Sequence, residues 1–155
     1  EDGIRDRSPS RGLGDVYKRQ QSALQCVYGY AVGIDFTCRD LQQAAKETGR
    51  PWDTAKGFDQ SAPISSIKPF PGNKELGDSK ITLSLNNEIR QQAKLTDMIW
   101  SVSEIISALS NFYELKAGDL IFTGTPSGVS SVVPGDHISA EIVGVGELQF
   151  EITEV

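Results

Sequence analysis

Alternation of apolar and polar side chains is the feature of this chain that most restricts its fold. Every second side chain is apolar within residues 81–86, and the same alternation returns at residues 148–152. Successive side chains of a β-strand point to opposite faces, so each segment predicts a strand with one face in a core. Asn86 and Asn87 directly follow the first strand and are suited to a tight turn. The sequence therefore predicts an antiparallel hairpin and a final strand at residues 147–155.

Three more segments favour strands. Residues 24–35 are rich in valine, tyrosine and isoleucine and contain two glycines, which is typical of a buried strand with close backbone approach. Residues 120–124 and 137–144 each follow a Gly-Asp turn and predict two further strands. Residues 61–79 are rich in proline, glycine and asparagine and predict a long connection.

One segment follows the helical period clearly. Residues 102–113 place apolar side chains at i, i+3, i+4, i+7, i+10 and i+11, which predicts a helix whose apolar face belongs to the core. Ser101 and Glu104 stand three residues apart at its start and predict a capping box, in which each side chain pairs with an amide of the first turn.

A second helix is predicted over residues 39–47. At 100° per residue, its apolar side contains Leu41 and Ala45, and its polar side contains Arg39 and Gln42. A strand-dominated pattern with two helices predicts an α+β architecture built around a rolled sheet.

Composition limits the function classes. The net charge of −6 argues against a nucleic-acid surface, and no apolar run is long enough to span a membrane. Without a recognisable secretory signal, a cytoplasmic location is expected. Residues 1–20 resemble a translated sequencing-adapter scar, and we expect a non-native or disordered leader there, followed by one domain at residues 21–155.

Asp35 is the first candidate for chemistry. It closes the predicted strand at residues 24–35 and stands four residues before Arg39 and seven before Gln42, so the three polar heads can converge. A carboxylate at a strand end offers oxygen ligands to a hard cation, and an arginine beside it can orient it or bind a substrate carboxylate. The alternative is a surface carboxylate near a helix start.

Two further candidates come later in the chain. Lys56 lies among small residues, and by itself this pattern is more typical of an ordinary surface lysine than of a catalytic one. The loop at residues 122–128 (FTGTPSG) offers amides and hydroxyls that can grip a carboxylate, although a tight turn without a ligand has the same pattern. His137, the one histidine, is expected to be exposed and without a role.

Four ordered segments carry a resemblance to a known family. GYAVGIDFTCRDLQ, GRPWDTAKGFDQSAPI, TDMIWSVSEIISALS and LKAGDLIFTGTPSGV are similar to segments of the fumarylacetoacetate hydrolase family, in its acylpyruvase and fumarylpyruvate hydrolase branch. The resemblance covers roughly residues 24–155. It implies that family's mixed β-sandwich roll, lacking its N-terminal part, and a homodimeric parent protein.

The resemblance also implies roles for single residues. Asp35 matches an acidic ligand of a Mg²⁺ or Mn²⁺ site, and Lys56 matches the lysine that stabilises the departing carbanion. Arg39 and Gln42 match polar groups beside the metal and substrate, with Gln42 counted among the catalytic residues. The substrate that the resemblance implies is a small anionic 2-oxo acid. The loop that holds its carboxylate is matched by Gly124, Thr125 and Pro126.

The chain departs from the family pattern in two respects. Ile34 stands where many members have asparagine, which fits the acylpyruvase branch. The family's two further metal ligands, from a Glu-x-Glu motif, and its water-activating histidine and glutamate would precede Leu24, and residues 1–23 contain neither motif nor histidine. We therefore expect a fragment that binds the cation poorly and turns over little.

Three functions remain open at this point. The first is hydrolysis of a carbon–carbon bond in fumarylpyruvate or acetylpyruvate. The second is decarboxylation of a 2-oxo acid or isomerisation of a dienedioate on the same fold. The third is a non-catalytic β-rich interaction domain in which the polar motifs are structural.

Overall fold

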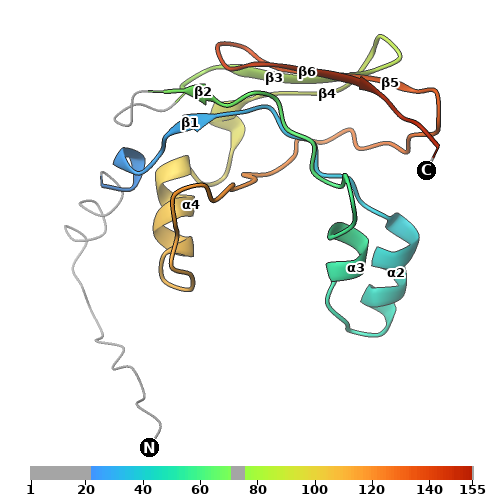
Figure 1. Ribbon diagram of the computed structural model, residues 1–155, viewed down its shortest axis with the longest axis horizontal. Coiled ribbons are helices and arrows are strands. Elements are labelled where there is room, and N and C mark those ends of the chain that lie inside the picture. Colours follow the sequence, from blue (N-terminus) through green and yellow to red (C-terminus); the bar gives the residue numbers. More distant parts are fainter. Residues whose placement is uncertain (1–21, 71–75, 155) are drawn as a thin grey trace, which may run out of the picture.

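A four-stranded antiparallel sheet forms one layer of the structure, at the top of Figure 1. The computed structural model describes residues 22–70 and 76–154, so the predicted leader lies outside the described residues. The sheet has the order β4-β3-β5-β6. Its members are β3 (Lys80–Leu85), β4 (Glu88–Lys94), β5 (His137–Ile142) and β6 (Gly146–Glu151). The predicted hairpin and the two predicted strands near the end of the chain are confirmed.

The hairpin turn has the predicted residues. Asn86 and Asn87 join β3 to β4 with φ angles of 51° and 67°, the left-handed backbone that a two-residue hairpin turn requires. Asn86 also contacts the start of β5, because its Nδ2 donates to Asp136 Oδ1 at 2.8 Å and its Oδ1 accepts from the His137 amide at 2.9 Å. The turn thus ties two strands that are far apart in sequence.

The second layer is an irregular antiparallel ribbon under the sheet (Figure 1). Strand β1 (Gly29–Tyr30) pairs with β2 (Lys68–Pro69), and the pairing continues only through an isolated bridge, Gly33–Ile64, and single hydrogen bonds. The predicted strand over residues 24–35 was therefore wrong in its bounds. Prolines in the partner segment, at positions 63 and 69, have no N–H to donate, so a regular ladder cannot form.

The core lies between the ribbon and the inner face of the sheet. Val32 is 1% exposed and Ile34 is 9% exposed, and both pack against side chains of the sheet. The buried cluster consists of Val32, Ile34, Leu85, Ile138, Ala140, Ile142 and Val145. Along β5 the buried residues alternate with exposed ones, as the period of a strand that is half in water requires.

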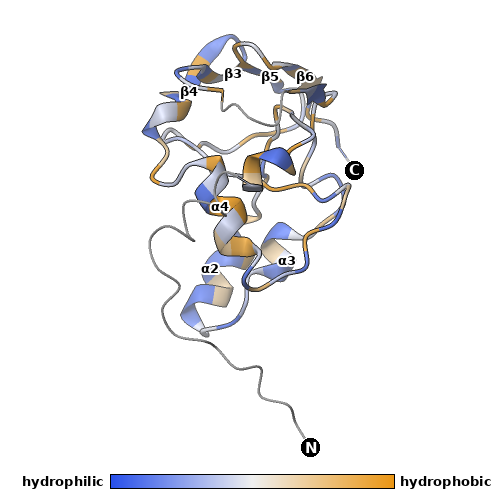
Figure 2. Cartoon of the chain, turned by 90° about the vertical axis from the view of Figure 1, so that its left-hand side faces the viewer, coloured by the Kyte–Doolittle hydropathy of each residue, from blue (hydrophilic) through white to orange (hydrophobic). Residues whose placement is uncertain are grey.

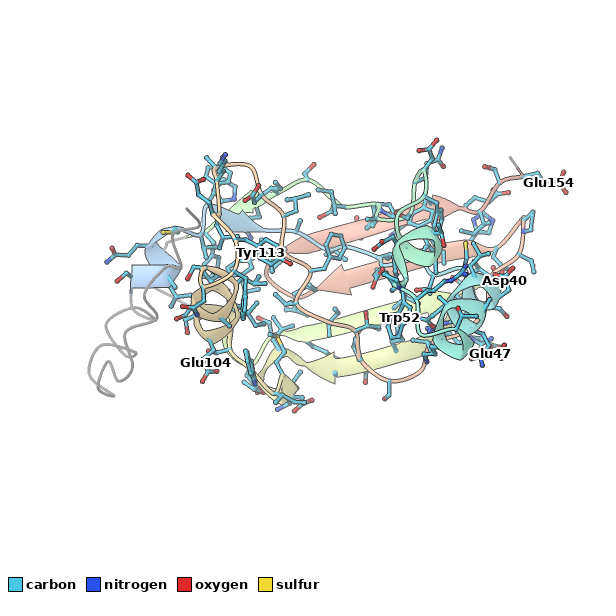
Figure 3. All side chains as sticks on the ribbon, turned by 90° about the horizontal axis from the view of Figure 1, so that it is seen from below. Asp40, Glu47, Trp52, Glu104, Tyr113 and Glu154 are labelled. Atoms are coloured by element: carbon cyan, nitrogen blue, oxygen red, sulfur yellow. The ribbon has the colours of Figure 1, made fainter. Side chains whose placement is uncertain are left out.

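The helices lie on the other side of the ribbon (Figure 1). One end carries α2 (Arg39–Glu47) and α3 (Asp53–Lys56). The other end carries α4 (Val102–Leu109), which follows the short 3₁₀ helix η1 (Leu95–Asp97). Figure 3 shows the two groups from below, with Asp40, Glu47 and Trp52 at one end and Glu104 and Tyr113 at the other.

The start of α4 was predicted correctly, and its core face was not. The capping box is present, with the Glu104 amide donating to Ser101 Oγ at 3.3 Å and the Ser101 amide donating to Glu104 Oε2 at 2.8 Å. No residue of α4 is buried, and Phe112, beyond its end, is 79% exposed. The helical period shows that one face is apolar, but it does not show what covers that face (Figure 2).

Residues 120–124 do not form the predicted strand. They have no β partner among the described residues, and Leu120 and Phe122 remain largely exposed. An apolar segment forms a strand only where a neighbouring backbone pairs with its N–H and C=O groups. Here the segment meets the ribbon through a side chain, with the Phe122 ring over Gly33. In a separate respect, every helix in the described part of the chain is too short or too polar to span a bilayer.

The core position at Ile138 gives a stability test. Ile138→Ala is expected to lower the free energy of unfolding by about 2–5 kcal/mol, because the side chain is removed from a packed core. Ile138 is 4% exposed at the centre of the buried cluster. The matched control is Ser139→Ala, one residue on and facing solvent, with an expected change within about 0.5 kcal/mol. Equal effects in urea unfolding would contradict this description of the core.

Asp136 gives a pH test. The amide of Val133 and then the side chain of Asn86 donate to this carboxylate, and they hold its pKa below the ordinary value of 3.8. A pKa lowered by folding adds stability above the unfolded value, and that stability is lost as pH falls through the folded value. The stability difference between wild type and Asp136→Asn should therefore be full near neutral pH and shrink below about pH 4. Urea midpoints across pH measure it, and a difference that grows toward acid would reject the cause.

Candidate active site

A lysine and an aspartate from separate segments meet at one end of the ribbon. Lys56, the last residue of α3, donates from Nζ to Asp35 Oδ2 at 2.6 Å. The backbone explains the meeting, because the Cys38 amide donates to the Ala55 carbonyl at 3.0 Å and holds the start of α2 on α3. Ala55 is fully buried there. The two residues that the resemblance assigned to one site are therefore in direct contact.

A second pair stands on the first turn of α2. Arg39 donates from its guanidinium to Gln42 Oε1 at 2.8 Å, and Gln42 is 7% exposed. This corrects the predicted helix faces, because Gln42 is buried and Leu41 is exposed. The buried residues of the helix are Gln42 and Ala45, and α3 is the helix that packs against it. Arg39 pairs with Gln42, and the structure records no hydrogen bond from it to Asp35.

The alternation of the ribbon places Asp35 on the face that points away from the sheet. Val32 and Ile34 enter the core, so Gly33 and Asp35 share the opposite face. On that face Phe122 lies directly over Gly33, where a Cβ would come within 2.7 Å of the Phe122 ring. Residues two apart on a strand are separated by about 6–7 Å. The segment that leads into the predicted carboxylate-holding loop therefore begins close to Asp35.

The other end of this loop is fixed to the sheet. The side-chain amide of Gln91 donates to the Pro126 carbonyl at 3.0 Å, and Gln91 is 9% exposed. Gly128 lies so close to the Arg90 carbonyl oxygen that a Cβ there would overlap it. Gly124, with φ at 121°, has a backbone that favours glycine. The loop is thus held at both ends.

The structure brings some predicted residues together and leaves others apart. It joins Asp35 to Lys56 and Arg39 to Gln42, while no hydrogen bond among the described residues joins the loop to either pair. Gln91 was not predicted from the sequence; in the structure it lies on the inner face of β4, two residues before the half-buried Ala93. His137 is exposed, as predicted, with its side chain 71% accessible.

Asp35 offers one carboxylate that a cation could use. Its carboxylate already carries a cationic group on Oδ2, and carboxylate oxygens are the ligands that hard divalent ions take. Within residues 22–70 and 76–154, no three His, Cys, Asp or Glu side chains cluster to hold a metal. The chemistry of the Asp35 carboxylate is compatible with a divalent cation, and the described residues do not complete a cluster of three such ligands around it.

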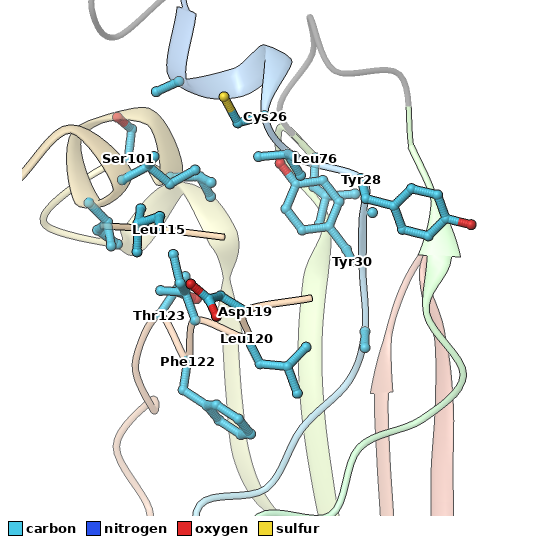
Figure 4. A pocket seen from close by; sticks show the side chains of 18 of the residues that line it. Cys26, Tyr28, Tyr30, Leu76, Ser101, Leu115, Asp119, Leu120, Phe122 and Thr123 are labelled. Carbon is cyan, nitrogen blue, oxygen red and sulfur yellow. The ribbon is translucent and has the colours of Figure 1, made fainter. Parts of the chain in front are cut away.

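A wide, open groove of about 1400 Å³ runs beside α4. Figure 4 shows Tyr28, Tyr30, Leu115, Leu120 and Phe122 along it. The groove reaches Gly33 and Gly124 but is not lined by Asp35 or Lys56. The pair Asp35–Lys56 thus lies outside the groove. The apolar face of α4 lines the groove.

Comparison with known proteins gives a consistent result. The family model described as fumarylacetoacetate (FAA) hydrolase C-terminal matches residues 10–153. The fumarylpyruvate hydrolase of a Ralstonia species is 41% identical over 86% of this chain and 69% of that protein. The mitochondrial oxaloacetate tautomerase of Arabidopsis thaliana is 42% identical over 84% of this chain and 58% of that protein.

A solved structure supports the fold directly. The fumarylpyruvate hydrolase from Pseudomonas aeruginosa, in complex with Mn²⁺ and pyruvate, is 43% identical to this chain with a TM-score of 0.81. The match covers 88% of this chain and 58% of that one. The expected α+β fold of the fumarylacetoacetate hydrolase type is confirmed. The chain spans less than two thirds of the length of most of these relatives.

The ion pair at Asp35 is expected to contribute little to stability. Lys56→Gln should change the free energy of unfolding by less than about 1 kcal/mol, because a solvent-exposed pair is screened by water. The side chains of Lys56 and Asp35 are 35% and 43% exposed. The matched control is Ala55→Gln, the same substituent one residue earlier in a buried position, where overpacking is expected to cost about 1–3 kcal/mol. Urea unfolding that ranks the two variants the other way would show that the pair is structural.

Proposed function

The chain belongs to the fumarylacetoacetate hydrolase family, and from this premise we propose that it carries part of the active site of a metal-dependent hydrolase. The proposed reaction splits a carbon–carbon bond in an acylpyruvate-type 2,4-dioxo acid such as fumarylpyruvate. The contact of 2.6 Å between Lys56 Nζ and Asp35 Oδ2 carries the proposal, because it sets a cationic group beside a cation ligand. The 41% identity to the Ralstonia fumarylpyruvate hydrolase supports the substrate class.

The proposed cofactor is a divalent cation, Mg²⁺ or Mn²⁺, with Asp35 as one ligand. The Pseudomonas relative, which is 43% identical, has Mn²⁺ and pyruvate in its structure. Such an ion supplies positive charge that stabilises a developing oxyanion of a 2-oxo acid. Because a hard cation takes about six oxygen ligands and Asp35 is one carboxylate, we propose that residues 1–155 alone bind it weakly and turn over little.

The residues of this chain divide the remaining work. The Lys56 ammonium stabilises the negative charge that develops on the substrate as the carbon–carbon bond breaks. An incoming substrate oxygen competes with Asp35 for this ammonium. Gln42 accepts from the Arg39 guanidinium at 2.8 Å, and this hydrogen bond fixes its side-chain amide on the first turn of α2. In the loop, the amides of Gly124 and Thr125 and the Thr125 hydroxyl donate to the substrate carboxylate, and Pro126, which has no N–H, fixes the backbone beside them.

A second candidate function uses the same residues. The Arabidopsis relative is named an oxaloacetate tautomerase and is 42% identical. Tautomerisation of oxaloacetate moves a proton between carbon 3 and the keto oxygen, and loss of its carbon-4 carboxylate as CO₂ leaves negative charge on carbon 3, beside the keto group. A divalent cation and a nearby ammonium would stabilise the charge in both reactions. The third candidate, a non-catalytic interaction domain, predicts instead that neither a cation nor a 2-oxo acid binds at Asp35.

The partner proposed for this site is a small anionic 2-oxo acid. The net charge of −6 disfavours nucleic acid, and Lys56, Arg39 and the loop supply the local positive charge and donors that an anion needs. A homodimeric parent protein and a cytoplasmic location remain predictions.

A chimera tests the reaction. Residues 24–155 would replace the aligned part of the Ralstonia fumarylpyruvate hydrolase, and we expect the chimera to cleave fumarylpyruvate when Mg²⁺ or Mn²⁺ is added. In it, Asp35→Asn and Lys56→Met should each lower kcat by about 100-fold or more, the usual effect of removing one group that stabilises transition-state charge. Loss of the fumarylpyruvate absorbance follows the reaction.

The control variant is Asp40→Asn, an exposed carboxylate on α2, which should leave kcat unchanged. A folded chimera that ignores acylpyruvates and instead tautomerises or decarboxylates oxaloacetate would favour the second candidate. A folded chimera that binds neither cation nor 2-oxo acid would favour the third. The 155-residue chain, assayed beside it, is expected to show only trace turnover.

A further inference from the structure

Gln91 is a buried polar side chain whose hydrogen bond leaves its own sheet. It lies on β4 at 9% exposure, on the face that carries the core. A buried amide is unfavourable unless it is hydrogen-bonded, and an apolar side chain would fill this position with less loss of hydration. Its Nε2 donates to the Pro126 carbonyl at 3.0 Å, 35 residues further along the chain. The amide therefore ties the sheet to one specific point of a loop.

A β-bulge beside Gln91 brings the backbone of β4 into close contact with the loop. Leu83 pairs with Gln91 and Ser84 pairs with Ile89, so Arg90 is the extra residue on β4. The bulge turns Ile89 outward, where it is 61% exposed, although it stands two residues before the inward Gln91. The Arg90 carbonyl then faces Gly128 at a distance that leaves no room for a Cβ.

Only three residues of the loop lie between its two fixed points. Phe122 lies on Gly33 at one end, and Pro126 accepts from Gln91 at the other. The three residues between them, 123–125, carry the amides and hydroxyls proposed to hold the substrate carboxylate. A short span fixed at both ends loses little further conformational entropy when it binds an anion.

We propose that Gln91 is a positioning residue that fixes the loop at residues 123–126 for binding of the substrate carboxylate, with the Arg90 bulge as its support. This inference rests on the proposed function, because it takes the loop to be the carboxylate holder. Gln91 does not touch the substrate and acts through the Pro126 carbonyl. Its removal should therefore weaken binding of a carboxylate more than it weakens the fold.

The test uses the full 155-residue chain, ¹⁵N-labelled, with pyruvate as the probe. Gln91→Leu removes the hydrogen-bond donor and fills the buried position with an apolar side chain of similar size. Gln91→Met serves the same purpose with a more adaptable side chain should Gln91→Leu fail to fold. Gln92→Leu is the matched control, the same substitution one residue on, at an exposed position. The ¹⁵N order parameters of residues 123–125, pyruvate-induced shifts at Gly124 and Thr125, and amide exchange in the sheet are recorded, together with the melting temperature.

We expect Gln91→Leu to lower the ¹⁵N order parameters of residues 123–125, because the loop loses its hydrogen bond to the sheet. The pyruvate dissociation constant should rise by about tenfold, the factor that one buried hydrogen bond typically contributes, and amide exchange in β3 and β5 should stay unchanged. Gln92→Leu should match wild type in all three respects.

Other outcomes separate the two proposals. Loop amides that ignore Gln91→Leu, or that respond equally to Gln92→Leu, would overturn the positioning role. Loop amides that respond to Gln91→Leu as expected, in a chain where pyruvate shifts amides elsewhere but not at residues 123–125, would overturn the carboxylate-holding role of the loop, and with it this part of the proposed function. A uniform loss of protection through the whole sheet would show that Gln91 serves the fold and not the loop.

Discussion

The antiparallel ribbon formed by residues 28–38 and 55–70 is the constraint on which the rest of the structure depends. Its alternation sends Val32 and Ile34 into the core and turns Gly33 and Asp35 to the opposite face. One segment therefore anchors the fold and presents the candidate site. A shift of one residue in its pairing would bury Asp35 and expose Val32, so the hydrophobic pattern itself protects the position of the carboxylate.

Stability and chemistry are separated along this ribbon. The core side is dry and apolar, whereas the ion pair of Asp35 and Lys56 remains more than one third exposed and is screened by water. A pair that adds little to folding can exchange its partner at little expense in stability. Such a pair suits a carboxylate that takes a cation and an ammonium that turns to a substrate, whereas a deeply buried pair would resist separation.

The sequence was informative where the cause of a structure is local. The Asn86-Asn87 turn, the Ser101 capping box and the alternating strands depend on neighbouring residues, and all three are present. The errors concern partners that a pattern does not name. The apolar face of α4 faces an open groove, and residues 120–124 have no neighbouring strand among the described residues. The candidate site shows the same division, because spacing alone paired Asp35 with Arg39, whereas the fold pairs it with Lys56.

Contacts between distant segments also explain why Gln91 escaped notice. As one residue in an alternating strand it is indistinguishable from a surface glutamine, and its meaning appears only when Pro126 is placed beside it. The charged residues of the site come from within 22 residues of one another, at positions 35–56, while the loop arrives from far along the chain. Two side-chain contacts, Phe122 on Gly33 and Gln91 on Pro126, are what join them through the fold. The position of the loop therefore depends on the position of the sheet that carries Gln91. Order in the loop is a result of tertiary packing and is not a property of the motif alone.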